Sequence, residues 1–291
     1  MGHLVIGALA LDRPVWLEES LQSGGRLRGR TLSGSFAGRL GGGGANAAVA
    51  LARAGRAVRL AASIADDADG KAVRALAEAE GLDLSLCCTR PGASGRTLIL
   101  IEPGGERVVL GLDDPKTDRR VVGPAEVRGW RPKGLFIRAA YVGAAQWAEA
   151  CEGPVLLHWP SSGYAGGCDV VVASRADLAD DVRAAPFETA AARLGPRLQW
   201  VVVTDGAAGA VAYAADRRIT MPAPRAEVRD ATGAGDVFAA GLLDALAAGA
   251  DMAPALAHAC RWGAIAVQFE GSAPTQAPAD AFAPFVSGDV S

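Results

Sequence analysis

The sequence predicts an α/β fold built on a doubly wound, mostly parallel sheet, with a small additional sheet beside it. Short apolar runs alternate with helical segments through much of the chain, which is typical of strands buried on both faces of a parallel sheet. Residues 13–40 and 94–111 interrupt this alternation, and we expect them to form the smaller sheet. Half of the 291 residues are hydrophobic, so the chain can build a large core.

The individual elements follow from the same pattern. The apolar run at 4–11 predicts the first buried strand, and the run at 58–64 predicts a second one. Further strands are expected at 134–138, 154–158, 169–173 and 200–204. Helices are expected at 45–54, 69–80, 235–249 and 253–269.

The two interrupting segments have the character of exposed strands. Residues 13–40 are charged and glycine-rich, with short alternating pieces. Residues 94–111 contain two alternating runs on either side of Pro103-Gly104-Gly105, which indicates a β-hairpin. No repeat and no Ser/Pro-rich linker divides the chain, so we expect one domain.

Composition excludes several classes of partner. The net charge is −3 and charges of both signs are interspersed, so there is no basic patch for nucleic acid or a membrane surface. The apolar run near the N-terminus ends at Asp12, too early to span a bilayer, and it has no signal-peptide features. The five cysteines form no CxxC pair, which favours reduced thiols. We therefore expect a soluble, cytoplasmic protein.

The most informative motif is the stretch DATGAGDVFAAG at residues 230–241. Its small residues at 233–235 allow backbone N–H groups to approach a ligand at a helix N-terminus, which suits a phosphate group. Asp236 follows in the first helical turn, and phosphoryl transfer needs a carboxylate that accepts a hydroxyl proton. By its spacing alone, the motif also fits a glycine-rich helix start capped by an acidic residue.

A second motif is the glycine-rich segment GGGGANAAVALARAG at residues 41–55. Gly42 and Gly43 offer bare backbone to a ligand, and Asn46 offers both a donor and an acceptor to hydroxyl groups. The spacing from Gly42 onward also fits the dinucleotide fingerprint G-x-G-x-x-A, but residues 33–40 are a poor strand to precede it. Walker A, HExxH and GxSxG motifs are absent.

These motifs resemble the ribokinase-like (PfkB) family of carbohydrate kinases. The stretch ending at Asp236 is similar to the family's signature D-T-x-G-A-G-D, and residues 41–55 are similar to its N-terminal signature. WVVVTDGAAGAVAY at 200–213 resembles the nucleotide-binding stretch, and AIAVQFEGSAP at 264–274 resembles the closing helix and loop near the adenine. The four motifs occur in the family's order.

The resemblance covers residues 4 to 285 and implies a ribokinase-like three-layer α/β/α sandwich. It implies a single kinase domain over residues 1–291, with segments 13–40 and 94–111 inserted as a β-sheet lid. It also implies transfer of the γ-phosphate of MgATP to a hydroxyl group of a sugar or sugar derivative. By analogy with relatives, we expect a homodimer that forms through the lid.

The resemblance, together with the strand pattern, assigns a role to each candidate site residue. The catalytic base is Asp236, and its anion hole comprises Gly233, Ala234 and Gly235. The substrate-binding candidates are Asp12, Gly42, Gly43, Asn46 and Arg138. The nucleotide-binding candidates are Ser174, Thr204, Gly206 and Gly209. The metal candidates are Asp177 for Mg²⁺ and Asp230 for a monovalent cation such as K⁺.

The chain departs from the family at one magnesium-binding motif. Relatives usually have N-x-x-E after a mid-chain strand, whereas this chain has Ser174 and Asp177. The shorter carboxylate of Asp177 puts metal or ATP affinity in question, and a non-catalytic nucleotide or sugar sensor is therefore one alternative function. The presence of Asp236 argues against it. A nucleoside kinase of the same family is the other alternative.

Three arginines bear on the substrate. Arg138 ends a predicted buried strand at the face where ligands bind, while Arg96 and Arg107 belong to the predicted hairpin. A guanidinium group there can bind a carboxylate, sulfonate or phosphate on the substrate, or it can simply be solvated. His158 and the other two histidines are expected to be structural.

Overall fold

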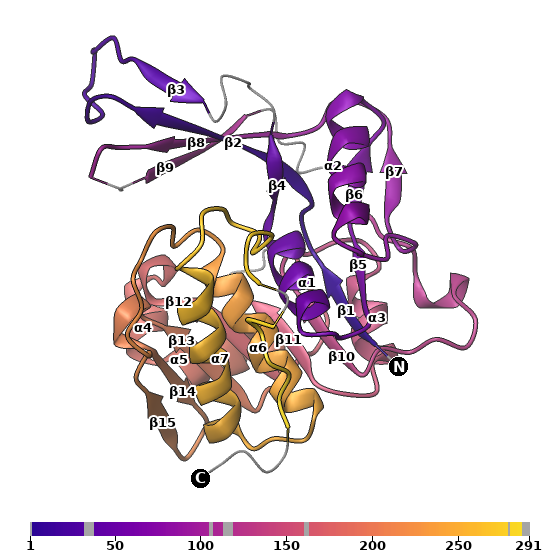
Figure 1. Cartoon of the computed structure of the whole chain (residues 1–291). Helices are drawn as coiled ribbons and strands as arrows, with labels where there is room; N and C mark the ends of the chain where they lie inside the picture. Colours follow the sequence, from indigo (N-terminus) through magenta and orange to yellow (C-terminus); the bar gives the residue numbers. More distant parts are fainter. Residues whose placement is uncertain are drawn as a thin grey trace.

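The computed structural model describes residues 2–31, 38–104, 107–112, 119–159, 163–278 and 280–286. An eight-stranded sheet forms the centre of the molecule, and a five-stranded sheet lies above it as the lid (Figure 1). A short third sheet pairs β6 (Ser63–Ala65) with β7 (Cys88–Arg90). The predicted fold class, a mostly parallel α/β/α sandwich with a small separate sheet, is confirmed.

The central sheet places several strand ends at one edge. Its strands are, in spatial order, β15 (Arg218–Met221), β14 (Ala210–Tyr213), β13 (Trp200–Thr204), β12 (Val170–Ser174), β11 (Val155–His158), β10 (Gly134–Ile137), β1 (His3–Ile6) and β5 (Val58–Ala61). The strands from β13 to β5 run parallel, and β14 and β15 add to the sheet in antiparallel fashion. The carboxyl ends of the parallel strands therefore share one edge, where ligands bind in such sheets.

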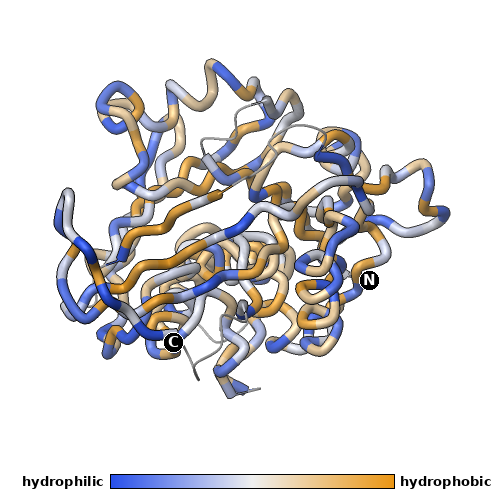
Figure 2. Tube along the Cα trace, turned by 90° about the horizontal axis from the view of Figure 1, so that it is seen from above, coloured by the Kyte–Doolittle hydropathy of each residue, from blue (hydrophilic) through white to orange (hydrophobic). Residues whose placement is uncertain are grey.

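Helices cover both faces of this sheet. One face carries α1 (Gly43–Arg53), α6 (Ala234–Ala247) and α7 (Met252–Ala266); the other carries α3 (Ala144–Ala150), α4 (Asp180–Ala184) and α5 (Pro186–Leu194). Along β1, Val5 belongs to the core on the α1 side, while Leu4 and Ile6 belong to the core on the α3 side. Figure 2 shows hydrophobic segments gathered inside the molecule and hydrophilic residues mostly in peripheral turns.

The lid sheet is formed by the two segments that interrupt the α/β alternation. Its strands are β2 (Ala10–Leu17), β3 (Gly29–Thr31), β4 (Arg39–Gly41), β8 (Arg96–Ile101) and β9 (Arg107–Leu112). The strands β8 and β9 form the predicted antiparallel hairpin. Helix α2 (Ala68–Ala79) lies beside β6 and contacts β2 and β4 (Figure 1).

Two expected strands were predicted too long. The run at 4–11 is not one strand, because β1 ends at Ile6 and the chain passes into the lid at Ala10. The run at 58–64 likewise divides into β5 and β6, which belong to different sheets. Apolar residues are needed on both sides of each break, so the hydropathy pattern does not mark where the chain changes sheets.

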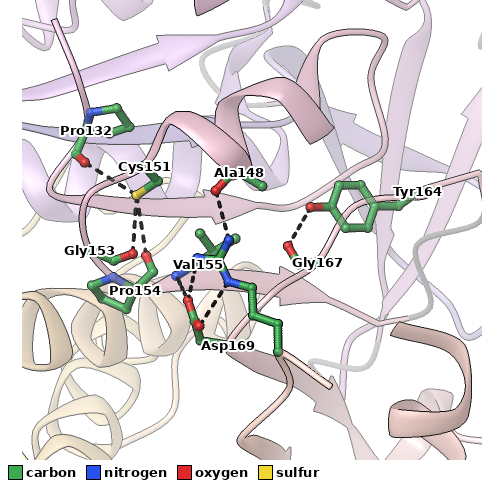
Figure 3. A network of polar contacts seen from close by, with 10 residues as sticks. Pro132, Ala148, Cys151, Gly153, Pro154, Val155, Tyr164, Gly167 and Asp169 are labelled. Atoms are coloured by element: carbon green, nitrogen blue, oxygen red, sulfur yellow. Dashed lines mark hydrogen bonds and ion pairs between the residues drawn. The ribbon is translucent and has the colours of Figure 1, made fainter. Parts of the chain in front are cut away.

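An ion pair fastens the sheet at the edge opposite the strand carboxyl ends. The carboxylate of Asp169 accepts hydrogen bonds from Arg197 Nε (3.1 Å) and Nη2 (2.9 Å) and from the Val155 N–H (2.8 Å). Arg197 Nη1 also donates to the carbonyl of Ala148 in α3, at 3.0 Å. Figure 3 shows the Asp169 carboxylate beside Val155, below Ala148 of the neighbouring helix. Two strands and a helix are thus tied together.

A more deeply buried carboxylate holds the far end of α6. Asp244 is 1% exposed, and it accepts hydrogen bonds from Arg56 Nε (2.5 Å) and from the backbone N–H of Phe285 (2.7 Å). His258 Nε2 lies 3.4 Å from Asp244 Oδ2. Although burial opposes ionisation, the contacts with His258 and Arg56 hold the pKa of Asp244 below its usual value. The helix that carries the predicted catalytic residue is thereby fixed to the C-terminal segment.

We expect Asp244→Ala to lower the free energy of unfolding by about 3–5 kcal/mol, because Arg56 and the Phe285 amide lose their partner. Urea unfolding measures this loss. Asp180→Ala is the matched control, since the Asp180 side chain is 98% exposed and pairs with Arg183 on the surface, so the loss is expected to stay under about 1 kcal/mol. Equal stabilities for the two variants would contradict the role assigned to Asp244.

Candidate active site

The first turn of α6 holds Asp236, whose side chain is fixed by two partners from distant segments. Asp236 is only 7% exposed. Asn46 Nδ2, in α1, donates to Asp236 Oδ2 at 2.9 Å. Arg138 Nε, directly after β10, donates to Asp236 Oδ1 at 2.5 Å. Three residues predicted for the site therefore meet at one point.

Two glycines of the second motif are required by this geometry. Gly42 has a φ of 92°, and a Cβ there would lie 2.6 Å from the carbonyl oxygen of Ala8. A Cβ at Gly43 would lie 2.7 Å from Arg138 Nε and 3.0 Å from Asp236 Oδ1. The absence of side chains at these two positions makes room for the Asp236–Arg138 ion pair as well as for a ligand.

The N-terminus of α6 fits the phosphate site that the sequence predicts. Gly233 begins the helix with a φ of 77°, and no side chain caps the helix there. A Cβ built at Gly235 would meet no atom within 4 Å, so the space in front of this turn is open. The buried Thr232 Oγ1 has no hydrogen-bond partner among the described residues. Amide groups, open space and the helix dipole together suit an anionic phosphate at residues 233–235.

Asp12 lies in the lid rather than at the end of the first core strand. It is the third residue of β2, and Ser272 Oγ donates to its Oδ2 at 2.5 Å. Burial raises the pKa of Asp12, although the Ser272 bond and the charge of Arg39 oppose this rise. Ser272 was not among the predicted residues, because the motif that contains it was assigned to the adenine end of the site.

Asp230 is already bonded on both oxygens. The backbone N–H of Thr232 donates to Oδ1 at 2.9 Å, and that of Gly271 donates to Oδ2 at 3.0 Å. Arg39 Nη2, in β4, lies 3.2 Å from the same Oδ2. Although burial opposes ionisation, these bonds and the charge of Arg39 hold the pKa of Asp230 below its usual value. The Asp230 carboxylate is thus paired with a guanidinium group from the lid.

The residues predicted for nucleotide binding lie at the carboxyl edge of β12 and β13. Ser174 and Thr204 are the last residues of these strands and are adjacent in register. Gly206 and Gly209 follow in the next turn, with φ values of 50° and 99°. Thr204 Oγ1 donates to a backbone carbonyl of β12 at 3.2 Å. Asp177 is exposed in the short helix after Ser174.

Asp177 is the residue that the sequence predicts as a ligand of Mg²⁺. The part of the chain that the structure describes holds no cluster of three or more His, Cys, Asp or Glu side chains suited to a metal ion. Mg²⁺ usually keeps several waters and takes one or two carboxylates together with substrate phosphates. The exposed carboxylate of Asp177, beside the predicted nucleotide residues, fits that pattern.

His158 is a site residue that the sequence did not reveal. It ends β11, and its Nδ1 lies 3.3 Å from Arg138 Nη1. Burial, aided by the charge of Arg138, lowers the pKa of His158 to about 4. The imidazole is therefore neutral near pH 7 and accepts a hydrogen bond from Arg138. The sequence signal for this role was that His158 ends a strand next to β10. A lone histidine without a motif around it does not mark a site by itself.

Known proteins share both the motifs and the fold. Residues 21–121 and 161–279 match the pfkB family of carbohydrate kinases. The chain belongs to this family. It is 31% identical over 265 residues to the ATP-dependent ribose-1-phosphate kinase of Halopiger xanaduensis, covering 84% of this chain and 86% of that protein. It is 27% identical over 268 residues to the aminoimidazole riboside kinase of Salmonella typhimurium, covering 80% and 83%. The ribokinase of Thermotoga maritima has a TM-score of 0.73 at 18% identity, covering 97% and 99%.

Family membership confirms the predicted class of enzyme, an ATP-dependent carbohydrate kinase of the pfkB family. The dinucleotide alternative is not supported, because the strand before Gly42 is β4, a short strand of the lid sheet. Among the described residues, no helix is both long enough and apolar enough to cross a membrane.

The low pKa of His158 makes the stability of this pfkB kinase depend on pH. Below pH 6.5 the unfolded chain protonates His158, while the folded protein resists protonation until about pH 4, so stability falls as the pH drops through this window. Between pH 7.5 and 5.5, we expect the free energy of unfolding to fall by about 1 kcal/mol less in His158→Gln than in the wild type. Urea unfolding at the two pH values measures the difference. An identical pH dependence of the two proteins would show that the pKa of His158 is not lowered in the folded protein.

Proposed function

We propose that this pfkB kinase transfers the γ-phosphate of MgATP to a hydroxyl group of a sugar or sugar derivative, with Asp236 as the general base. The observation that supports this most is the fixed position of the Asp236 carboxylate, which is buried and held by Asn46 and Arg138 at the start of α6. A general base must be oriented before the proton arrives, and two hydrogen bonds from different segments provide that orientation.

The residues around Asp236 divide the remaining work of phosphoryl transfer. The amides of Gly233, Ala234 and Gly235 hold the γ-phosphoryl group at the helix N-terminus. Asp236 takes the proton of the acceptor hydroxyl as the new O–P bond forms, and the bond to ADP breaks with its electron pair remaining on the β-phosphate oxygen. The guanidinium group of Arg138 lies beside this carboxylate and offsets the negative charge of the reacting groups during the transfer.

The remaining candidates position the two substrates. We place the acceptor between Asp12 of the lid and the backbone of Gly42 and Gly43. We place the nucleotide at the edge that carries Ser174, Thr204, Gly206 and Gly209. Asp177 would hold Mg²⁺, which would supply positive charge next to the phosphates. Asp230, paired with Arg39, remains the candidate for contact with a monovalent cation such as K⁺.

Two alternatives predict different acceptors. A nucleoside kinase is supported by the relative named as an aminoimidazole riboside kinase, whereas the relative named as a ribose-1-phosphate kinase supports a sugar derivative. A non-catalytic sensor has no use for a buried carboxylate with two fixed partners at an open helix N-terminus. ADP release from MgATP with a panel of sugars, sugar acids, sugar phosphates and nucleosides distinguishes all three.

The Asp236→Asn variant tests the proposed chemistry. We expect kcat to fall about 10²–10⁴-fold because the amide does not accept the hydroxyl proton, while ATP affinity changes little. Coupled ADP release measures turnover, and titration calorimetry measures nucleotide binding. Asp180→Asn, at an exposed position, is the matched control and should retain full activity. Loss of ATP binding in Asp236→Asn would instead assign Asp236 a structural role.

We also propose a homodimer that forms through the lid, in a cytoplasmic protein. Strand β9 lies at an edge of the lid sheet and pairs only with β8 among the described strands. Its apolar side chains Val108, Val109, Leu110 and Leu112 are all exposed. An exposed apolar edge strand favours pairing with a second copy. The five cysteines are free thiols, as suits a reducing compartment.

Charge on the exposed face of β9 should prevent this dimer. Val109 is 56% exposed, and Val109→Glu is expected to shift the protein from dimer to monomer in analytical ultracentrifugation, because the carboxylate loses its hydration at the interface. Val142→Glu is the control, since Val142 is exposed outside the lid sheet and should leave the assembly unchanged. A monomeric wild type would refute the dimer without bearing on catalysis.

A further inference from the structure

His158 and Arg138 lie side by side at the carboxyl edge of the central sheet. The residues that precede them, Leu157 of β11 and Ile137 of β10, are paired in register. The backbone N–H of Arg138 donates to the carbonyl of Ile6 in β1 at 2.8 Å, and His158 pairs with β12 on its other side. The sheet therefore fixes the backbone of both residues.

The contact between the two side chains defines the protonation state of the histidine. Arg138 Nη1 lies 3.3 Å from His158 Nδ1, and a guanidinium group donates hydrogen bonds but accepts none. Nδ1 is therefore the unprotonated nitrogen of a neutral ring, and the ring proton is on Nε2. Burial and the charge of Arg138 lower the pKa of His158 to about 4, against the opposing charge of Asp236, which agrees with a neutral ring at pH 7.

The guanidinium group of Arg138 is thus held at two corners. Its Nε donates to Asp236 Oδ1 at 2.5 Å, and its Nη1 donates to His158. The stem of the side chain is confined as well, since a Cβ at Gly43 would lie 2.8 Å from Arg138 Cγ and one at Gly7 would lie 2.9 Å from Arg138 Cβ. With its stem and two corners held, the guanidinium plane has a fixed direction.

The ion pair that results is made at a single point. Between Arg138 and Asp236, both of which the structure describes, the hydrogen bond is formed by Nε alone. Arg197, by contrast, donates to both oxygens of Asp169 through Nε and Nη2, the side-on form that such pairs frequently adopt. Bringing Nη2 of Arg138 onto Asp236 requires the guanidinium group to turn, and its bond to His158 resists this turn.

The single-point form matters because Asp236 is the proposed base. A carboxylate offers about four lone-pair positions, and Asn46 Nδ2 and Arg138 Nε take one on each oxygen. In the side-on form, Nη2 would take a further position, on the oxygen that Asn46 already contacts. The side-on form would therefore compete with the acceptor hydroxyl for the base.

We propose that His158 is a positioning residue of the phosphoryl transfer, which holds the Nη1 corner of Arg138 and so keeps Asp236 bonded at a single point and open to the acceptor hydroxyl. The inference rests on the proposed function and adds a residue to it. His158 contacts neither substrate and moves no proton in this mechanism. Its effect passes through Arg138, so it appears in kcat rather than in substrate affinity.

Kinetics of the full chain, with MgATP and an acceptor that is turned over, test this role. We expect His158→Leu to lower kcat about 10-fold and to change KM for either substrate less than about 2-fold, because leucine accepts no hydrogen bond and Arg138 turns onto Asp236. His158→Asn should recover most of the loss, since its Oδ1 accepts from Arg138 in place of Nδ1. Unchanged kcat in His158→Leu overturns the inference.

The matched control is His3→Leu. His3 is a buried histidine at the start of β1, at the edge of the sheet opposite the site, so the same substitution there should leave kcat unchanged. A loss of kcat in His3→Leu as large as that in His158→Leu would show a general effect on folding and overturn the inference.

A double-mutant cycle separates positioning from a loss of structure. In an Arg138→Met background, adding His158→Leu should cause no further loss of kcat, because the guanidinium group that His158 holds is already gone. Losses that multiply in the double variant, or equal losses in His158→Leu and His158→Asn, would show that His158 does not act through Arg138 and would overturn the inference.

The contact also has a readout that does not depend on turnover. Nitrogen NMR at pH 7 reports the tautomer of each histidine, and the His158 resonances are those that disappear in His158→Leu. We expect the neutral Nε2–H form in the wild type and a changed Nδ1 resonance in Arg138→Met. A charged ring or the Nδ1–H tautomer in the wild type overturns the inference. The expected spectra in a chain that turns over no acceptor would remove the kinase function while supporting the contact between His158 and Arg138.

Discussion

The ion pair between Asp236 and Arg138 is the interaction on which the site depends. It joins the first turn of α6 to the end of β10, and it passes so close to Gly43 that a Cβ there would lie 2.7 Å from Arg138 Nε. Asn46 completes the arrangement from α1. The start of α1, the carboxyl edge of the sheet and the start of α6 must therefore be correctly placed together, and the buried cores on both faces of the sheet fix those positions.

The lid is fastened to the same centre by two further contacts. Arg39 of β4 bonds Asp230, which begins the catalytic motif, and Asp12 of β2 accepts a hydrogen bond from Ser272. These contacts come from lid strands that are adjacent in the sheet, since β4 pairs with β2. Residue 230 precedes α6 and residue 272 follows α7, and the Gly271 N–H donates to Asp230, so the lid is bonded to two loops that meet at one end of this helical pair. The position of the lid and the start of α6 are thus coupled through charged and buried groups.

The sequence predicted those parts of the site that lie within continuous motifs. The residues around Asp236 and Gly42 could be recognised because a tight helix start and a close backbone approach each require small residues at fixed spacing. His158 and Ser272 could not, because each acts through a partner 20 or more residues away and nothing beside it in the chain marks that contact. The break between β1 and β2 was missed for a similar reason, since apolar residues are buried in both sheets.

The charges of the cleft follow one principle of pairing. Asp236 is paired with Arg138, Asp230 with Arg39, and Asp69 with Arg13, so each of these carboxylates has a guanidinium partner within 3.2 Å. Each pair joins segments that lie far apart in the chain, so the paired guanidinium groups hold the lid, the start of α6 and the end of β10 in one frame.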